Sequence, residues 1–166
     1  PHQRLNAATA AQLFDSLVAR DALSGRAEEC ARAALNLKWP CRFEAFTLPM
    51  LHGVHLILDV AHNEPAVSAL VSSIDLLYPS RRVALILGAN RDKDVSKVLH
   101  EWDGLGGGRL CARIAVASSH PKAMPAAEIV DMEATRRVAT PWRAAASMRD
   151  ALRAAADGLA DDGGSP

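Results

Sequence analysis

The chain has 166 residues, of which 49% are hydrophobic and 23% charged, a profile typical of one globular domain of ordinary size. Nineteen basic residues balance nineteen acidic ones, so no net charge favours binding to nucleic acid or to an anionic membrane surface. Aromatic residues make up only 4%, which also disfavours a stacking platform for single-stranded nucleic acid.

Cysteine spacing and the length of the apolar runs limit the cellular locations expected for the protein. The three cysteines are widely spaced and form neither a disulfide framework nor a metal motif, so a reducing compartment is the default. Apolar runs fall far short of the roughly 20 residues that a membrane span needs. The first residues carry neither an initiator Met nor a signal peptide, so we expect a fragment or a processed chain. We expect a cytoplasmic protein, with a mitochondrial or plastid location left open.

The first 38 residues are typical of two helices. Apolar residues in an Ala-rich background predict a helix from Asn6 to about Ala22, which Gly25 breaks. A second helix is predicted from Arg26 to about Leu37, and Pro40 prevents its continuation because the residue before a proline is disfavoured in the α region. We therefore place a domain boundary between residues 38 and 39.

After this boundary the pattern alternates between strands and helices. Strands are predicted at 42–48, 54–60, 83–88 and 110–117, helices at 63–78, 95–102, 125–137 and 144–160, a Gly-rich loop at 104–108 and a flexible tail at 161–166. Such alternation implies right-handed crossovers and a mainly parallel sheet with helices on both faces. We predict a Rossmann-like α/β domain over residues 39–166, with Trp39, Trp102 and Trp142 as packing groups.

The ten residues from Leu56 to Pro65 are the most informative stretch. The apolar run at their start fits a strand buried on both faces, while Asn63 suits an N-cap and Pro65 a first helical turn. Asp59 and His62 should therefore lie at the carboxyl end of a strand and beside a helix N-terminus. Open α/β sheets bind ligands there, and free N–H groups attract anions.

Each polar residue of this stretch has a structural alternative to a role in binding. Asp59 can accept hydrogen bonds from ribose hydroxyls, or it can cap the helix or pair with a base. His62 can lie against a nucleotide, or it can hold the loop. Asn63 is better explained as a helix cap than as a ligand.

Two basic residues outside this stretch are further candidates. Arg42 can clamp phosphate oxygens and offset the charge of phosphoryl transfer, or it can form a surface ion pair with Glu44 worth about 0–1 kcal/mol. Lys93 can bind a substrate carboxylate as a point charge. Alternatively, Asp92, Lys93 and Asp94 form a solvated helix start, where acidic side chains are favoured.

A family resemblance rests on four short motifs in a fixed order. Three of them resemble the motifs W-P-G-R-x-E, L-D-G/V-A-H-N and D-K-D. In the same order, these are Trp39-Pro-Cys-Arg42-Phe-Glu44, Leu58-Asp-Val-Ala-His-Asn63 and Asp92-Lys-Asp94. These motifs belong to the C-terminal part of folylpolyglutamate synthases and dihydrofolate synthases of the Mur ligase superfamily. His2-Gln3-x-x-Asn6-Ala7 is similar to the H-Q-x-x-N-A segment that closes their central domain. The resemblance covers nearly the whole chain.

The resemblance implies an ATP-dependent amide ligation. ATP phosphorylates the carboxylate of a folate or a pteroate such as dihydropteroate, and the amino group of L-glutamate then displaces phosphate from the acyl phosphate. Residues 1–38 would end the central ATP-binding domain, and residues 39–166 would form the C-terminal glutamate ligase domain. The phosphate loop and the Mg²⁺ ligands belong to the central domain, and Gly104 to Gly108 lacks the Lys and Ser/Thr of such a loop. We expect the protein to be a monomer. We also expect that this segment alone does not catalyse ligation.

The resemblance also implies roles for individual residues. Asn6 would contact adenine (its alternative is an N-cap of the first helix), and Asp59 and His62 would contact ATP. Arg42 would reach the ATP phosphates across a domain interface and act with His62 in catalysis. The Gly that the family places before this Arg is Cys41 here, so the local turn can differ.

On the glutamate side, the resemblance implies that Lys93 binds the incoming amino acid. Ser118, Ser119 and His120 end a strand at the same sheet edge, and from that position we expect them to help bind glutamate. Three other functions stay open. The chain can be a Rossmann-like module that binds a nucleotide or a partner without chemistry, or part of another Mur-type amino-acid ligase. A hydrolase using Asp59 and His62 is disfavoured, because no Ser or Cys stands in a nucleophile elbow.

Overall fold

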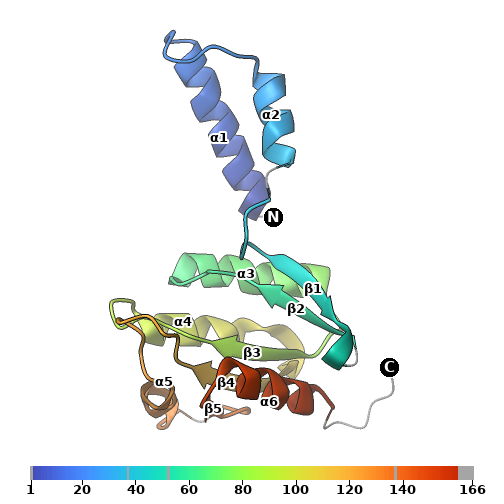
Figure 1. Ribbon diagram of the computed structural model, residues 1–166, viewed down its shortest axis with the longest axis vertical. Coiled ribbons are helices and arrows are strands. Elements are labelled where there is room, and N and C mark those ends of the chain that lie inside the picture. Colours follow the sequence, from blue (N-terminus) through green and yellow to red (C-terminus); the bar gives the residue numbers. More distant parts are fainter. Residues whose placement is uncertain (1, 37, 52, 137, 161–166) are drawn as a thin grey trace. The chain divides into compact units, whose positions relative to one another are not determined.

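The computed structural model describes residues 2–36, 38–51, 53–136 and 138–160 (Figure 1). It divides into two compact units, Pro1–Glu44 and Ala45–Pro166. The sequence-based boundary between residues 38 and 39 stays a prediction. The expected tail at 161–166 and the expected helix ends at residues 37 and 137 lie outside the described residues. None of the described helices combines the length and the apolar character needed to cross a bilayer.

The first unit contains two helices that pack side by side, α1 (His2–Val18) and α2 (Ala27–Leu35). The predicted bounds of the first helix were wrong by four residues at each end, because α1 begins at His2 and not at Asn6, and ends at Val18 and not near Ala22. Asp21 adopts a left-handed φ of +55°, which turns the chain out of the helix. The break at Gly25 is confirmed, with a φ of +152° that disfavours other residues.

Two paired strands follow, β1 (Glu44–Leu48) and β2 (Val54–Leu58), joined through a 3₁₀ turn, η1 (Pro49–Leu51). All of their residues except Glu44 belong to the second unit. Within the described residues, β2 pairs with β1 and belongs to no larger sheet. The prediction of a strand buried on both faces was therefore wrong: Leu58 is 36% exposed and Val60, beyond the strand end, is 44% exposed.

A three-stranded parallel sheet forms the centre of the second unit, in the order β3 (Val83–Leu87), β4 (Leu110–Val116) and β5 (Trp142–Ala145). The predicted α/β class and parallel sheet are confirmed. Every residue from Arg113 to Val116 is buried, so both faces of β4 are covered. Figure 1 shows α6 (Met148–Ala160) on one side of the sheet, and α3 (Glu64–Leu77) and α4 (Val95–Glu101) on the other.

Two predicted segments near the C-terminal end were wrong in their type or extent. The predicted helix 144–160 begins only at Met148, because Trp142–Ala145 pairs with β4 and outweighs the helix propensity of an Ala-rich sequence. The hydroxyl of Ser147 then accepts a hydrogen bond from the Asp150 N–H (3.1 Å) and caps α6. The helix predicted to start at Pro125, α5 (Ala126–Glu133), ends earlier than expected.

The contact between α6 and the sheet explains a small residue in the helix. A Cβ atom on Gly158 would lie 2.9 Å from the Cβ of Ala112 on β4, so the helix approaches the strand at a distance that only glycine allows. The guanidinium of Arg82 donates to the carbonyls of Leu159 (2.9 Å) and Gly158 (3.0 Å). This side chain thus binds carbonyl groups of the last turn of α6.

An ion network crosses the opposite face of the sheet. Arg113 donates to Asp103 at 2.6 Å, and Arg136 bridges Asp103 and Glu133. Burial of Asp103 opposes its ionisation, but the hydrogen bonds and charges of the two arginines outweigh burial and lower the pKa of Asp103 below its ordinary value of 3.8. The hydrogen bond to Asp103 raises the pKa of Arg136 against the opposing effect of burial. The network ties β4 to α5 and to the segment after α4.

The tryptophans and the Gly-rich segment complete the comparison with the predictions. Trp102 and Trp142 are 5% and 6% exposed, as expected for packing groups. Trp39 is 64% exposed, so the same expectation was wrong there. The predicted loop at 104–108 contains parts of two short 3₁₀ turns, η2 (Trp102–Gly104) and η3 (Gly106–Gly108).

Candidate functional site

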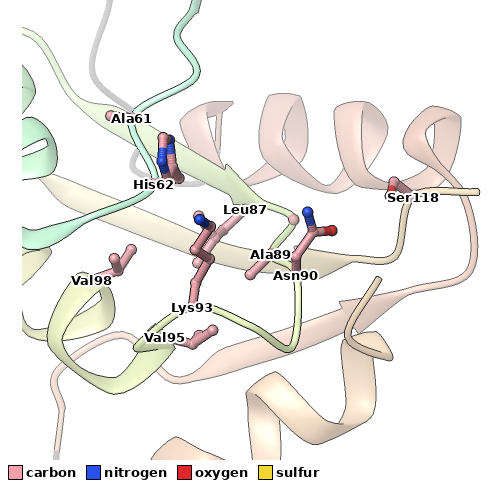
Figure 2. Close-up of a pocket in the computed structure, with 10 residues that line it drawn as sticks. Ala61, His62, Leu87, Ala89, Asn90, Lys93, Val95, Val98 and Ser118 are labelled. Atoms are coloured by element: carbon pink, nitrogen blue, oxygen red, sulfur yellow. The ribbon is translucent and has the colours of Figure 1, made fainter. Parts of the chain in front are cut away.

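A pocket of about 370 Å³ lies where three strands of the second unit end. Small-molecule sites have volumes of this order, and open α/β sheets place them at the carboxyl ends of strands. Figure 2 shows the polar ends of His62, Lys93 and Asn90 in this pocket, with Ser118 at the end of β4. The complete lining is Ala61, His62, Leu87, Gly88, Ala89, Asn90, Lys93, Val95, Val98 and Ser118.

The turn from β2 to α3 is fixed by its own side chains. One carboxylate oxygen of Asp59 accepts a hydrogen bond from the Ala61 N–H (2.8 Å). The side chain of Asn63 accepts from the Ala66 N–H (3.0 Å), with Pro65 in the first turn of α3, so the predicted cap is confirmed. Asp59 is not a lining residue of the pocket, whereas His62 is. The turn therefore presents His62 and uses one oxygen of Asp59 to hold its own shape.

The geometry of His62 assigns its protons. Nδ1 lies 3.0 Å from the carbonyl oxygen of Val60, and a carbonyl oxygen can only accept. Nδ1 therefore carries the hydrogen, and Nε2 of the neutral ring is an acceptor. A protonated ring would offer Nε2 as a donor instead.

The loop from β3 to α4 supplies the positive charge of the pocket. Lys93 has no ion-pair partner among the described residues, and none of the residues that line the pocket is a carboxylate. Asp94 caps α4 by accepting a hydrogen bond from the Lys97 N–H (3.4 Å), so the predicted alternative of an acidic helix start is confirmed for Asp94. The result is a pocket with an unpaired ammonium group that can attract an anionic ligand.

Asn90 is a pocket residue that the sequence reasoning missed. It lies two residues after Gly88, directly beyond β3, and a polar side chain just after an apolar strand was the available signal. Gly88 itself lies close to the neighbouring strand: a Cβ there would be 3.0 Å from the Val116 carbonyl oxygen. The backbone of β3 and that of β4 are therefore closely packed where Gly88 lines the pocket.

The loop after β4 separates two residues that were predicted to act together. Ser118 lines the pocket, and its hydroxyl accepts a hydrogen bond from the His120 N–H (3.3 Å). His120 is exposed and does not line the pocket; its Nδ1 accepts from the Lys122 N–H (3.1 Å). Within the described part of the chain, no hydrogen bond joins Ser118 to His62. The geometry thus contains no serine–histidine nucleophile at this pocket.

Backbone hydrogen bonds join the two loops that hold these residues. The Arg91 N–H donates to the Lys122 carbonyl, and the Met124 N–H donates to the Ala89 carbonyl, each at 2.9 Å. Asn90 also forms an isolated bridge with Ala123. The loops after β3 and β4 therefore form one connected frame around the pocket.

Arg42 belongs to the first unit and is described there. It is exposed and has no ion-pair partner in the described ranges, so the predicted alternative of a pair with Glu44 is wrong. The carboxylate of Glu44 instead accepts a hydrogen bond from the Cys41 N–H (2.9 Å). Cys41 and Phe43 both have left-handed φ angles, +57° and +51°, which cost about 1–2 kcal/mol each for residues other than glycine.

Asn6 lies in the second turn of α1 and is exposed. Its predicted alternative as an N-cap was wrong, because the helix already begins at His2. The described residues also contain no group of three or more His, Cys, Asp or Glu side chains that could hold a metal ion.

Together these features define an α/β domain with a positively charged pocket at its strand ends. The chain belongs to the Mur ligase family: the family described as "Mur ligase, glutamate ligase domain" matches residues 41–165. No curated protein matches the chain at a significant level.

Solved structures of folylpolyglutamate synthases are similar to the chain in fold. The enzyme from Mycobacterium tuberculosis, complexed with ADP and AMPPCP, is 24% identical, with a TM-score of 0.66 over 84% of this chain and 29% of its own. FolC from E. coli, in complex with DHPP and ADP, is 22% identical, with a TM-score of 0.66 over 90% and 32%. The Thermotoga maritima enzyme is 26% identical, with a TM-score of 0.62 over 93% and 33%. The chain spans about a third of the length of these proteins.

Proposed function

We propose that this chain is part of an ATP-dependent ligase that joins L-glutamate to a carboxylate of a folate or pteroate through an acyl phosphate. In this proposal residues 39–166 supply the C-terminal domain that contacts ATP and glutamate, and residues 1–38 end the central ATP-binding domain. Membership of the glutamate ligase domain family supports the amino-acid substrate. The observation that carries the proposal is the unpaired Lys93 ammonium in a pocket without a lining carboxylate.

The pocket has the chemistry that an amino-acid substrate requires. Lys93 provides a point charge for a carboxylate, and Asn90 and Ser118 provide hydrogen-bonding groups beside it. Val95 and Val98 give an apolar wall for methylene groups. His120 would act indirectly through Ser118. Its backbone N–H donates to the Ser118 hydroxyl, and its imidazole does not line the pocket.

Nucleotide binding is assigned to Asn6, Arg42, Asp59 and His62, as the family resemblance implies. Arg42 is an exposed guanidinium without an ion-pair partner in the described residues, which suits a clamp on phosphate oxygens. His62 presents Nε2 from a turn fixed by a helix cap. Arg42 and His62 are the proposed catalytic residues, because they would contact the reacting phosphates.

The metal requirement of such a ligase would be met outside this chain. ADP, AMPPNP and a manganese ion are named in the structures of the similar enzymes. The described residues offer no cluster of metal ligands, so Mg²⁺ would be held with ATP by the central domain. We therefore propose that this segment alone does not ligate, that the whole protein is a monomer, and that closure of the domains excludes water from the acyl phosphate.

The test is ATP-dependent glutamate incorporation by the full-length protein. Arg42→Ala and Asp59→Ala should each lower the rate at saturating glutamate by at least about tenfold, because Arg42 would lose its contact to the transferring phosphoryl group and Asp59 its hold on the nucleotide. Assays with dihydropteroate and with folate distinguish the two acceptors. Unchanged rates in both variants would refute the nucleotide site. Incorporation of another amino acid in place of glutamate would instead indicate a different Mur-type ligase.

A further inference from the structure

Residues 41–44 form a turn that their own conformational preferences oppose. Cys41 and Phe43 both adopt the left-handed region, which glycine and asparagine enter most readily. Arg42 lies between them and is exposed. Two unfavourable residues on either side of an arginine require an interaction that holds the backbone in this shape.

That interaction comes from a side chain of the same segment. Glu44 Oε2 accepts the Cys41 N–H at 2.9 Å, and Glu44 is partly buried. A carboxylate that accepts a backbone N–H forms a charge-assisted hydrogen bond, which is stronger than a neutral one. The bond spans Arg42 and closes a short loop around it.

The direction of the Arg42 side chain depends on this closed loop. If Cys41 returned to a right-handed φ, the peptide plane before Arg42 would rotate and its Cα–Cβ bond would point elsewhere. The guanidinium stands at the end of a long side chain, so a small backbone rotation becomes a displacement of several ångströms. Positions that clamp phosphate oxygens do not tolerate such displacements.

We infer that Glu44 is a positioning residue for Arg42: its carboxylate holds Cys41 in the left-handed conformation and thereby aims the guanidinium. This inference rests on the proposed function, in which Arg42 contacts the ATP phosphates. In this inference Glu44 acts through the Cys41 N–H and not through a contact with ATP, glutamate or the acceptor. Its loss should affect catalysis only while Arg42 is present.

A double-mutant cycle in the full-length protein tests this dependence. The variants are Arg42→Ala, Glu44→Ala and the pair of both, each assayed for kcat and for KM of ATP in ATP-dependent glutamate incorporation. Glu44→Ala should lower kcat/KM for ATP by about 10- to 100-fold, in the range caused by a misplaced catalytic group. Added to Arg42→Ala, the same change should cause less than a twofold further loss.

Two further variants separate aiming from folding. Glu44→Gln retains an oxygen that accepts the Cys41 N–H, so most of the activity should remain. Cys41→Gly added to Glu44→Ala should recover part of the loss, because glycine enters the left-handed region without the steric cost. Glu28→Ala removes an exposed glutamate of α2 in the same unit and should leave kcat/KM unchanged. Thermal melting of every variant reports whether the fold is intact.

The outcomes distinguish the inference from the proposed function. If Arg42→Ala leaves ligation unchanged, the nucleotide role of Arg42 is wrong and Glu44 has nothing to position. If Arg42→Ala impairs ligation and the double variant shows the product of the two single losses in kcat/KM, Glu44 acts independently of Arg42. In that case only the inference is overturned. If Glu44→Ala does not fold, the other two variants still test the inference. It is overturned if Glu44→Gln loses as much kcat/KM as the double variant Glu44→Ala/Cys41→Gly.

Discussion

Arg113, in the central strand of the parallel sheet, donates to Asp103 at 2.6 Å, and its side chain is only 7% exposed. Asp103 also binds Arg136, which pairs with Glu133 as well, so two carboxylates balance the two arginines. Within the described residues, Nε and Nη1 of Arg113 are buried without a partner, which leaves the bond to Asp103 as the main compensation for burying this charge. The carboxylate is therefore important for the stability of the second unit.

Replacing Asp103 with Asn should destabilise the protein by about 3 kcal/mol, because a buried guanidinium then lacks its counter-ion. Urea unfolding followed by circular dichroism measures the change. Asp131→Asn is the matched control, since Asp131 is an exposed carboxylate on α5 without an ion pair in the described residues. A loss below about 0.5 kcal/mol in both variants would contradict the role of the network.

The same carboxylate predicts a pH dependence. Because the pKa of Asp103 is lower in the folded protein than its ordinary value of 3.8, the stabilisation is complete well above 3.8, starts to decline near it and is lost as the pH falls through the lower pKa of the folded protein. The difference in unfolding free energy between wild type and Asp103→Asn should thus narrow between about pH 6 and about pH 3. A difference that stays constant over this range would show that ionisation of Asp103 does not stabilise the fold.

Gly158 should not accept a larger side chain. A Cβ there would lie 2.9 Å from the Ala112 Cβ, which is attached to a strand and cannot swing away. We expect Gly158→Val to lower the unfolding free energy by about 2 kcal/mol, within the range for overpacking. Gly104→Val is the control, because a Cβ at that position meets no atom within 4 Å and Gly104 has no positive φ. Equal effects at both positions would argue against the close contact.

Lys93 should govern the affinity for glutamate. In the full-length protein, Lys93→Gln should raise KM for glutamate by about 10- to 100-fold, as expected for the loss of a charged hydrogen bond of about 1.5–3 kcal/mol. The control Lys97→Gln changes an exposed lysine of α4, which pairs with Asp94 (3.4 Å) and does not line the pocket. If both variants keep the KM of the wild type, the pocket is not the glutamate site.

Local chemistry explains what the sequence predicted well. The cap formed by Asn63 and the placement of Pro65 depend on a few neighbouring residues, and both are confirmed. The parallel sheet followed from the regular alternation of apolar strands and amphipathic helices. His62, Lys93 and Ser118, which were expected at strand ends, line one pocket, because strand ends of one α/β unit converge.

The errors arose where distant pairing decides the outcome. The short strand Trp142–Ala145 is Ala-rich, and only its pairing with β4 distinguishes it from the start of a helix. The exposure of Leu58 depends on β2 pairing with β1, which an apolar run of residues does not reveal. Asn90 was overlooked because an asparagine after a strand is also an ordinary turn residue.

The backbone bonds between the loops after β3 and β4 have a consequence for engineering. They join Arg91 to Lys122 and Ala89 to Met124 through N–H and carbonyl groups, so they do not depend on the side chains at these positions. The frame of the pocket would therefore survive exchanges at Asn90, Lys93 and Ser118. If the proposed function holds, a library restricted to these three positions would sample new amino-acid preferences on an unchanged scaffold.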